Sequence, residues 1–439
     1  NSLFVLHQHE GKNPEMYEVA EVDASELISG GTTVLRDPKR HVLVVAHAWY
    51  GDVIGGSFRL ASELAESLAN AGHRVTYVCC SPEAGPAPAL ETVGNVELRR
   101  YPLPARSLTV AGRLWSHVSR TARLVADVHR KSPIDVVCGH SPLQFWGATR
   151  ALRRHRVVRN YTVHSPFDEE VLANTPAGEL DLHTRARAVA AAWIDRCNLD
   201  AADRVQTISS YTLKTMTGKH GRRVQQKASV VPGWVDAERF RPAGPKHWLR
   251  QAKGEPWSED VPVFFTLRRL ERRMGLETLI EAAAHLRRTG YRFRVMIGGG
   301  GPLREELQRR IDEQELQECV KLLGRIPEEE LPGCYAAADC FVLPTRSLEC
   351  FGLIVLEAYA AGTPVIASRI AAIPELIRYQ GEEWLFEPGN SWQLADRMHQ
   401  FMDGELLPTR NLQRIADGYD QDAVLRQWHE AVMPETTCQ

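Results

Sequence analysis

Two glutamates enclose an almost wholly apolar stretch, and their spacing could bring both carboxylates onto one ligand. Glu349 and Glu357 stand at either side of "CFGLIVL". The surrounding segment "CFVLPTRSLECFGLIVLEAYAAG" (340–362) predicts a strand, a loop and a helix that begins at about Leu353. Glu349 then lies in the loop and Glu357 in the second helical turn. Because a carboxylate is costly to desolvate, each must reach either solvent or a polar ligand.

A ligand with hydroxyl groups and an anionic group would suit this arrangement. Carboxylates accept hydrogen bonds in pairs, which fits sugar hydroxyls. The free N–H groups of the first helical turn lie between the two glutamates and attract an anion. We therefore interpret the stretch as binding a sugar at Glu349, a phosphate at the helix start and a ribose at Glu357. The alternative is that both side chains reach water at the ends of a core helix.

Two glycine-rich turns follow other predicted strands. Gly55 and Gly56 directly precede a helix, and paired glycines let a phosphate approach a helix N-terminus. The turn "MIGGGGPLREEL" (296–307) also joins a strand to a helix. It fits a nicotinamide fingerprint poorly, because the third glycine would fall on Leu303. A nucleotide or sugar beside this turn is the remaining functional interpretation, and a plain turn is the structural one.

A cluster of arginines ends the strand predicted at 261–270. Guanidinium groups bind phosphate oxygens in forked geometry, so several together favour an anionic ligand. The alternative is a solvated basic turn. The four arginines stand at positions 268, 269, 272 and 273.

The elements that would position these loops alternate between strand and helix nearly everywhere after residue 40. Apolar, β-branched runs of this kind are typical of strands buried on both faces of a parallel sheet. Five or six per half predict two Rossmann-like, doubly wound α/β domains, with ligands beyond the carboxyl ends of the strands and a cleft between the domains. The predicted strands lie at 41–47, 73–79, 134–140, 157–165, 203–209, 227–233, 261–270, 293–299, 319–326, 340–345 and 363–368.

We divide the chain into five parts. An extension of unknown role at 1–40 precedes the first domain at 41–236. A linker rich in proline, glycine and charge at 237–260 leads to the second domain at 261–410. The last segment, 411–439, holds an amphipathic helix that we expect to pack back towards the first domain.

Composition excludes several classes of protein. The 439 residues carry a net charge of −2, which argues against a nucleic-acid-binding protein. The nine cysteines are scattered and form no C-x-x-C, which fits a reducing cytoplasm. No run approaches the ~20 apolar residues of a membrane span, and the first residues lack the pattern of a secretory signal. We therefore expect a cytoplasmic protein without a transmembrane segment, and predict no oligomeric state.

Over about 41–435 the sequence resembles the retaining family 4 glycosyltransferases of GT-B fold. That family carries an E-x7-E element, which stands here as Glu349, Cys350, Phe351, Gly352 and Glu357. Other matching blocks occur in the family's order. They are "HAWYGDVIGGSFRLASELAESLANAGHRV" (47–75), "YTVHSP" (161–166), "VVPGWVDAERFRP" (230–242), "LRRLERRMGLETLIEA" (267–282), "GGGPLREEL" (299–307), "LLGRIPEEELPGCYAAADCFVLPT" (322–345) and "EAYAAGTPVIASRIAAIPELI" (357–377).

The resemblance implies transfer of a sugar from a nucleotide diphosphate sugar with retention of anomeric configuration, without a metal or a further cofactor. The first domain would bind the acceptor and the second the donor. Glu357 would hold the ribose hydroxyls and Glu349 the donor sugar. Backbone N–H groups of Phe351, Gly352 and Leu353 would meet sugar hydroxyls and the diphosphate.

Further roles follow from the same resemblance. Arg269 would bind the diphosphate, and His164 would lie near the reacting sugar. Gly55 and Gly56 would lie beside the phosphates, and the backbone at Arg325 beside the base. Gly299 and Cys350 complete the predicted donor site.

The chain departs from the family pattern at several of these positions. The lysine of the family's R-x4-K pair is Met274 here, and Arg273 or Arg272 would supply the missing charge. Cys350 and Arg268 replace usual glycines. The pair Ala371-Ala372 likewise stands where two glycines are usual.

Several functions remain open. We favour a small-molecule acceptor in specialised metabolism and front-face attack without a covalent intermediate. A basic helical stretch, "GRLWSHVSRTARLVADVHR" (112–130), either is a solvated face or rests on an anionic membrane, where the acceptor would be lipid-linked. A nucleotide-sugar 2-epimerase, a phosphorylase and a non-catalytic binder of sugar nucleotides would also be compatible with these motifs. The Asp420-x-Asp422 pair is expected to cap the C-terminal helix instead of binding a metal.

Overall fold

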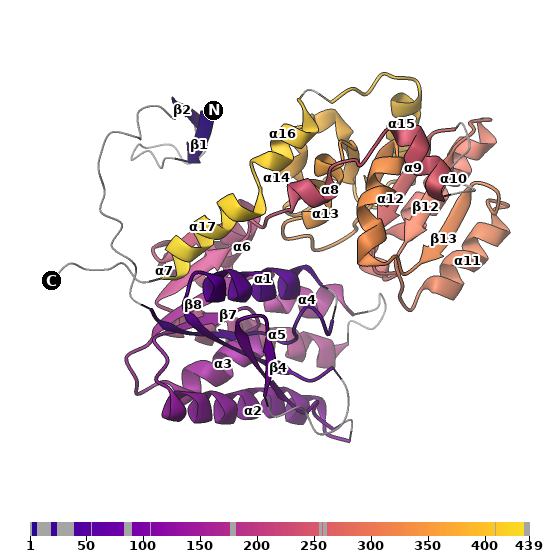
Figure 1. The fold of residues 1–439 in the computed structure, drawn as a ribbon. Helices are drawn as coiled ribbons and strands as arrows, with labels where there is room; N and C mark the ends of the chain where they lie inside the picture. Colours follow the sequence, from indigo (N-terminus) through magenta and orange to yellow (C-terminus); the bar gives the residue numbers. More distant parts are fainter. Residues whose placement is uncertain are drawn as a thin grey trace. The chain divides into compact units, whose positions relative to one another are not determined.

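The computed structural model describes residues 2–6, 19–23, 39–53, 55–82, 90–105, 107–175, 181–253, 257, 261–408 and 410–433. The chain divides into two compact units, 1–38 with 436–439, and 39–435. In the first unit, β1 (Ser2–Leu6) pairs with β2 (Val19–Asp23) in antiparallel register. The second unit contains two larger sheets, each covered by helices (Figure 1).

The first of these sheets has eight strands in the order β10-β9-β8-β7-β3-β4-β6-β5. All neighbours are parallel except β5 and β6. The chain runs outward from β3 through β4 and β6, then returns to the other side of β3 at β7, so the order reverses between β3 and β7. The strands are β3 (His41–Val45), β4 (Arg74–Cys80), β5 (Glu91–Val93), β6 (Val96–Tyr101), β7 (Val136–Gly139), β8 (Val158–Val163), β9 (Arg204–Thr207) and β10 (Ala228–Val230).

Alternation along β3 explains why both faces of this sheet are covered. Val42 and Val44 join the core cluster that contains Leu60 and Leu64 of α1. Leu43 and Val45 join a second cluster that contains residues of α2 and α3. Successive side chains of a strand point to opposite faces, so a continuous apolar run needs helices on both. The main helices of this half are α1 (Gly56–Asn70), α2 (Val110–Lys131), α3 (Pro142–Ala151), α5 (Leu182–Ala201) and α6 (Ser210–His220).

The second sheet has six parallel strands in the order β13-β12-β11-β14-β15-β16. Its order reverses between β11 and β14. The strands are β11 (Val263–Leu267), β12 (Arg294–Gly298), β13 (Val320–Gly324), β14 (Cys340–Leu343), β15 (Val365–Ser368) and β16 (Leu385–Phe386). The helices are α10 (Leu276–Arg288), α11 (Arg304–Glu313), α12 (Leu331–Ala337), α13 (Leu353–Ala360), α14 (Ile373–Ile377) and α15 (Ser391–Met402). The predicted pair of Rossmann-like domains is confirmed.

The segment predicted as a linker is partly helical. It holds α8 (Ala237–Phe240) and α9 (Lys246–Lys253), which pack against α12. Apolar anchors explain this order, because Phe240 and Trp257 are buried, and the Trp257 ring lies 5.8 Å from that of Phe265.

The C-terminal segment contains α16 (Leu412–Asp417) and α17 (Gln421–Val432). Asp420 caps α17 by accepting a hydrogen bond from the Asp422 N–H at 3.1 Å, as expected from the sequence. The end of α17 lies against the first sheet, since the Asn160 side-chain amide donates to the carbonyl of Val432 at 2.8 Å.

Candidate functional site

The switch point of the second sheet brings an arginine, a threonine and a glutamate together. Arg268 follows β11, and Thr345 follows β14, so the two residues lie at adjacent carboxyl strand ends, where ligands of doubly wound sheets bind. Arg268 Nη2 donates to Thr345 Oγ1 at 3.0 Å and to Glu349 Oε2 at 2.9 Å. The Arg268 side chain is only 8% exposed, and its Nε is buried with no partner in the described part of the chain.

The loop before α13 holds Glu349 in place with strained backbone. Leu348 has φ +56° and Ala371 has φ +52°, a conformation that non-glycine residues seldom adopt. The Glu349 carbonyl accepts the N–H of Ala372 at 3.0 Å, which ties the two strained segments together. Gly352, with φ +97°, directly precedes α13, and no described side chain caps the first turn of that helix. The amides of that turn are therefore available to an anion.

Glu357 is buried and already has two partners. Tyr335 donates its hydroxyl to Oε2 at 2.8 Å, and Arg59 of α1 donates Nη1 to Oε1 at 3.0 Å. Burial raises the pKa of Glu357, although the Arg59 charge acts in the opposite direction. Arg59 also contacts Glu63 at 2.8 Å. This buried cluster links α1 of the first sheet to α13 of the second, so a ribose at Glu357 would have to share its carboxylate with Arg59.

The four predicted arginines point to different places. Arg269 is 68% exposed and pairs with Glu271 at 2.9 Å. Arg272 is 52% exposed and pairs with Glu306 at 2.9 Å. Arg273 donates to the Leu348 carbonyl at 3.2 Å, and burial and the nearby Arg268 charge lower its pKa. The role predicted for Arg269 stays a prediction. Arg268, which the sequence placed in the arginine cluster and which departs from the family pattern, faces Glu349.

The glycine turn after β12 packs against the arginine turn. A Cβ at Gly299, whose φ is +120°, would lie 1.8 Å from the Arg268 carbonyl oxygen, so no side chain fits there. The Arg268 N–H donates to the Gly298 carbonyl at 3.0 Å, and Gly299 donates to Gly324 at 2.7 Å. Arg325, next to Gly324, is exposed. Gly299 therefore has a packing role that would hold whether or not it contacts a nucleotide.

Other predicted residues lie where the two halves of the fold are in contact. A Cβ at Gly56 would come within 3.3 Å of the Leu353 side chain, so the start of α1 lies against the start of α13. Gly55 precedes α1 without a side-chain cap. Phe351 and Leu353 both pack against Gly233, where a Cβ would come within 3 Å of each. Together with Cys350, whose burial raises its pKa, these side chains form packed core, which leaves their backbone groups for any ligand.

The switch point of the first sheet carries histidines. His164 follows β8, and its Nε2 lies 3.0 Å from Nδ1 of His140, which follows β7. His47 follows β3, and its ring lies 5.2 Å from that of His117 on α2. The His117 ring also contacts the Tyr101 hydroxyl at 2.9 Å. His47, His117 and His140 were not predicted from the sequence, although His47 and His140 are the last residues of predicted strands, a signal that could have found them.

These histidines are neutral in the folded protein at neutral pH. Desolvation lowers the pKa of His164 to about 4, and desolvation followed by the charge of His164 lowers the pKa of His140 well below its usual range. Desolvation, the His47 charge and the Arg120 charge lower the pKa of His117 to about 4. Neutral imidazoles can each donate and accept a hydrogen bond, which suits a hydroxyl-bearing ligand.

We expect acid to destabilise the protein through the His140–His164 pair. An unfolded histidine titrates near 6.5, so below that pH the unfolded chain binds protons that the folded chain excludes. Stability is therefore complete above about pH 6.5 and is lost as the pH falls towards 4, by up to ~3 kcal/mol for His164. The check is Tm against pH for wild type, His164→Asn and His183→Asn, an exposed control. His164→Asn should flatten the curve, and His183→Asn should not. Parallel curves for all three would contradict the assignment.

Two family models match this chain, one in each half of the fold. The family model described as "Glycosyltransferase Family 4" matches residues 54–239, and that described as "Glycosyl transferases group 1" matches residues 250–416. Among the described residues, no helix has the length and apolar character to cross a membrane.

Curated relatives match over part of their length. A GDP-mannose-dependent alpha-(1-6)-phosphatidylinositol monomannoside mannosyltransferase of Mycolicibacterium smegmatis is 36% identical over 183 residues, which are 40% of this chain and 47% of the relative. The Mycobacterium tuberculosis protein of the same name is 30% identical over 52% of this chain and 59% of its own length. The chain thus spans about half the length of these relatives. A 2-deoxystreptamine glucosyltransferase of Streptomyces kanamyceticus is 25% identical over 70% of this chain and 79% of the relative.

Solved structures share the whole fold. A sucrose-phosphate synthase from Thermosynechococcus elongatus superposes with a TM-score of 0.75 at 20% identity, over 89% of this chain and 98% of the other. Anabaena Alr3699/HepE in complex with UDP and glucose gives 0.67 at 19% identity over the same shares. At these identities the likeness establishes the architecture alone, two doubly wound sheets in GT-B arrangement.

Proposed function

Because the chain belongs to the family 4 glycosyltransferases of GT-B fold, we propose that it transfers a sugar from a nucleotide diphosphate sugar to a hydroxyl-bearing acceptor with retention of configuration. One observation carries this proposal. Arg268, Glu349 and the uncapped start of α13 meet at the switch point of the second sheet, next to the glycine-led start of α1. The site thus combines a buried cation that follows β11 with a carboxylate and free amides from the loop and first turn of α13.

The donor would lie along this site. Its diphosphate would meet the amides at Gly352 and Leu353 and the guanidinium of Arg268, whose unpartnered Nε offers a further donor. Arg268 would then supply the charge that the family takes from lysine at the position of Met274, which is buried here. Arg269, which is exposed, would bind the diphosphate from the edge of the site. The donor sugar would hydrogen-bond to Glu349, and the ribose to Glu357.

The chemistry we propose is front-face substitution. The anomeric C–O bond breaks with its electron pair going to the departing phosphate, through an oxocarbenium-like state. The acceptor oxygen attacks from the same face and gives its proton to a phosphate oxygen. The protein's contribution is electrostatic stabilisation of the leaving diphosphate and positioning of the acceptor. This scheme requires neither a covalent intermediate nor a metal or further cofactor.

The acceptor would be a small molecule bound at the first switch point. His164, His140 and His47 surround that position with groups that are neutral and able to exchange donor and acceptor roles. The relative named as a 2-deoxystreptamine glucosyltransferase supports a small polyhydroxyl acceptor. A lipid-linked headgroup is the second candidate, favoured by the aromatic and basic surface described below and by the relatives named for phosphatidylinositol monomannoside.

A donor screen tests the proposal. UDP-, GDP-, ADP- and dTDP-sugars are added separately, and the Tm of the full chain is measured. A ligand at 100 times its Kd stabilises by about 2.7 kcal/mol, a shift of several degrees. We expect one nucleotide sugar to produce this shift and, with acceptor, a product of retained configuration by NMR. Turnover without an acceptor would indicate an epimerase, and binding without product a non-catalytic binder. No shift with any donor would overturn the proposal.

A further inference from the structure

Three tryptophans, one from each of three neighbouring helices, meet on the surface of the first half. The Trp115 ring of α2 lies 6.1 Å from the Trp146 ring of α3, which lies 5.4 Å from the Trp193 ring of α5. Trp115 is 50% exposed and Trp193 is 54% exposed. Two large, half-exposed aromatic rings on the two helices that flank α3 mark an interaction surface, because isolated monomers seldom leave contiguous apolar patches uncovered.

Aliphatic side chains extend this patch along α5. Leu182 is 82% exposed and Val189 is 71% exposed. Their spacing of seven residues, and of four more to Trp193, puts all three on one side of the helix. At the start of α2, Leu108 and Val110 are 40% and 42% exposed.

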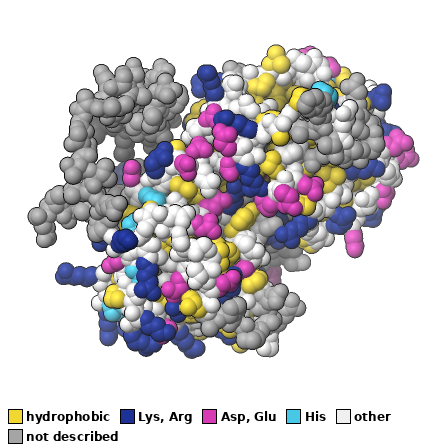
Figure 2. Space-filling model, in the orientation of Figure 1, with side chains coloured by type: hydrophobic (Ala, Val, Ile, Leu, Met, Phe, Trp, Pro, Cys, Tyr) yellow, Lys and Arg dark blue, Asp and Glu magenta, His cyan; other side chains and the backbone are white. Residues whose placement is uncertain are grey.

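Positive charge surrounds the patch. Residues 107–160 contain ten arginine and lysine residues but only two acidic ones, in a chain whose net charge is −2. Arg150 lies over two of the tryptophans, 5.3 Å from the centre of Trp115 and 5.9 Å from that of Trp146. In Figure 2, dark blue side chains gather over the lower part of the molecule, where Figure 1 labels α2.

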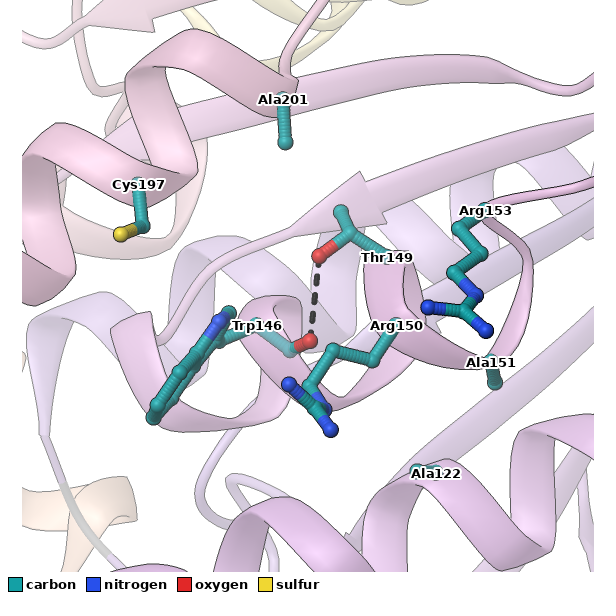
Figure 3. A pocket seen from close by; sticks show the side chains of 8 residues that line it. All are labelled: Ala122, Trp146, Thr149, Arg150, Ala151, Arg153, Cys197 and Ala201. Carbon is teal, nitrogen blue, oxygen red and sulfur yellow. Dashed lines mark hydrogen bonds between the residues drawn. The ribbon is translucent and has the colours of Figure 1, made fainter.

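A hollow of about 480 Å³ opens between α2, α3 and α5. Figure 3 shows Trp146, Thr149, Arg150 and Arg153 of α3 and the turn after it, lying between Cys197 of α5 and Ala122 of α2. None of the eight lining residues is acidic. The hollow has room for a phosphorylated headgroup, and its two guanidinium groups match that charge.

We propose that this surface docks on an anionic lipid bilayer. We call it the tryptophan–arginine face and define it by Trp115, Trp146, Arg150, Arg153, Val189 and Trp193. Tryptophan is favoured at the headgroup level of a membrane, and basic side chains are drawn to anionic lipids. Nucleic acid would also attract arginine and stack on tryptophan, but it offers nothing to the exposed aliphatic residues of α5. Docking does not depend on sugar transfer, although it would bring a lipid-linked acceptor to the enzyme.

Co-sedimentation with vesicles tests the docking without a donor or an acceptor. The full chain is mixed with vesicles of phosphatidylcholine alone, or of phosphatidylcholine and phosphatidylglycerol in equal parts. We expect binding only to the mixed vesicles, weakening as salt is raised, with a blue shift of tryptophan fluorescence. One basic side chain near such a surface contributes roughly a five-fold factor, so Arg150→Glu/Arg153→Glu should weaken partitioning by about 25-fold or more. Trp193→Ala should reduce the blue shift.

Matched variants elsewhere serve as controls. Trp392 is 69% exposed on α15, and Arg292 is exposed just before β12. Trp392→Ala and Arg292→Glu should bind vesicles as the wild type does. Failure of the wild type to bind mixed vesicles at low salt, or an equal loss in the control variants, would overturn the proposal. Transfer RNA that displaces the protein from vesicles and binds it more tightly would assign the face to nucleic acid. Because these measurements involve no turnover, they stand whether or not the transferase proposal holds.

Discussion

Glu357→Gln is expected to lower kcat/KM by at least about 100-fold and to remove the thermal shift caused by the donor. Glutamine keeps the shape of the side chain but loses the charge and one acceptor oxygen. Hydrogen bonds to a charged group contribute about 1.5–3 kcal/mol each, so losing one from a ribose hydroxyl and weakening the other accounts for a change of this size. Steady-state kinetics with varied donor, together with Tm measured with and without donor, make the check.

The same substitution should also destabilise the ligand-free protein. Arg59 and Glu357 are 10% and 8% exposed, and removing one member of such a buried pair costs up to about 3–5 kcal/mol. Glu63 remains as a partner of Arg59 and reduces that cost. Tyr335→Phe is the matched control, because it removes one hydrogen bond to Glu357 and leaves the charge, at about 1.5–3 kcal/mol. A lower Tm with an unchanged donor KM would mean that Glu357 only joins α1 to α13.

Arg268→Ala is expected to reduce kcat by about 10²–10³-fold with a smaller rise in donor KM. Removing one group that stabilises developing negative charge typically has an effect of this size. Arg268 is buried and faces Glu349, so its guanidinium is held where a diphosphate at the start of α13 would gain charge. Arg269→Ala should cost less than ten-fold, because Arg269 is 68% exposed.

A second substitution separates lost charge from lost packing. Met274→Lys places the family's lysine in the Arg268→Ala background, and it should restore part of kcat if Arg268 acts as a cation. If Arg268 only orients Glu349, the added lysine will restore nothing, while Arg268→Lys will lower both Tm and kcat. A greater loss of kcat in Arg269→Ala than in Arg268→Ala would mean that Arg269 binds the diphosphate, as the family resemblance implies.

Local chemistry accounts for what could be predicted of the site. The strand, loop and helix around Glu349 and Glu357 were predicted with the helix beginning at Leu353, where α13 begins. The glycine turn, the arginine turn and His164 also lie at the carboxyl ends of strands. These features follow from apolar runs and from glycine at turns, which depend on near neighbours in the chain.

Long-range contacts account for what could not be predicted. Arg59 is separated from Glu357 by 298 positions, and nothing in either local pattern indicates the other. His140 and His164 form a pair only because β7 and β8 are neighbours in the sheet. The three tryptophans belong to separate helices, and none of their segments alone predicts a shared surface.

The sequence by itself determined the two doubly wound sheets and the positions of the loops that end their strands, because hydrophobic periodicity is a local property. Only the tertiary structure decided which arginine faces Glu349. Arg268 and Arg269 are neighbours in the turn after β11, yet one turns into the site and the other into water. Composition treats the two as equivalent, and the packing of the glycine turn against Arg268 distinguishes them.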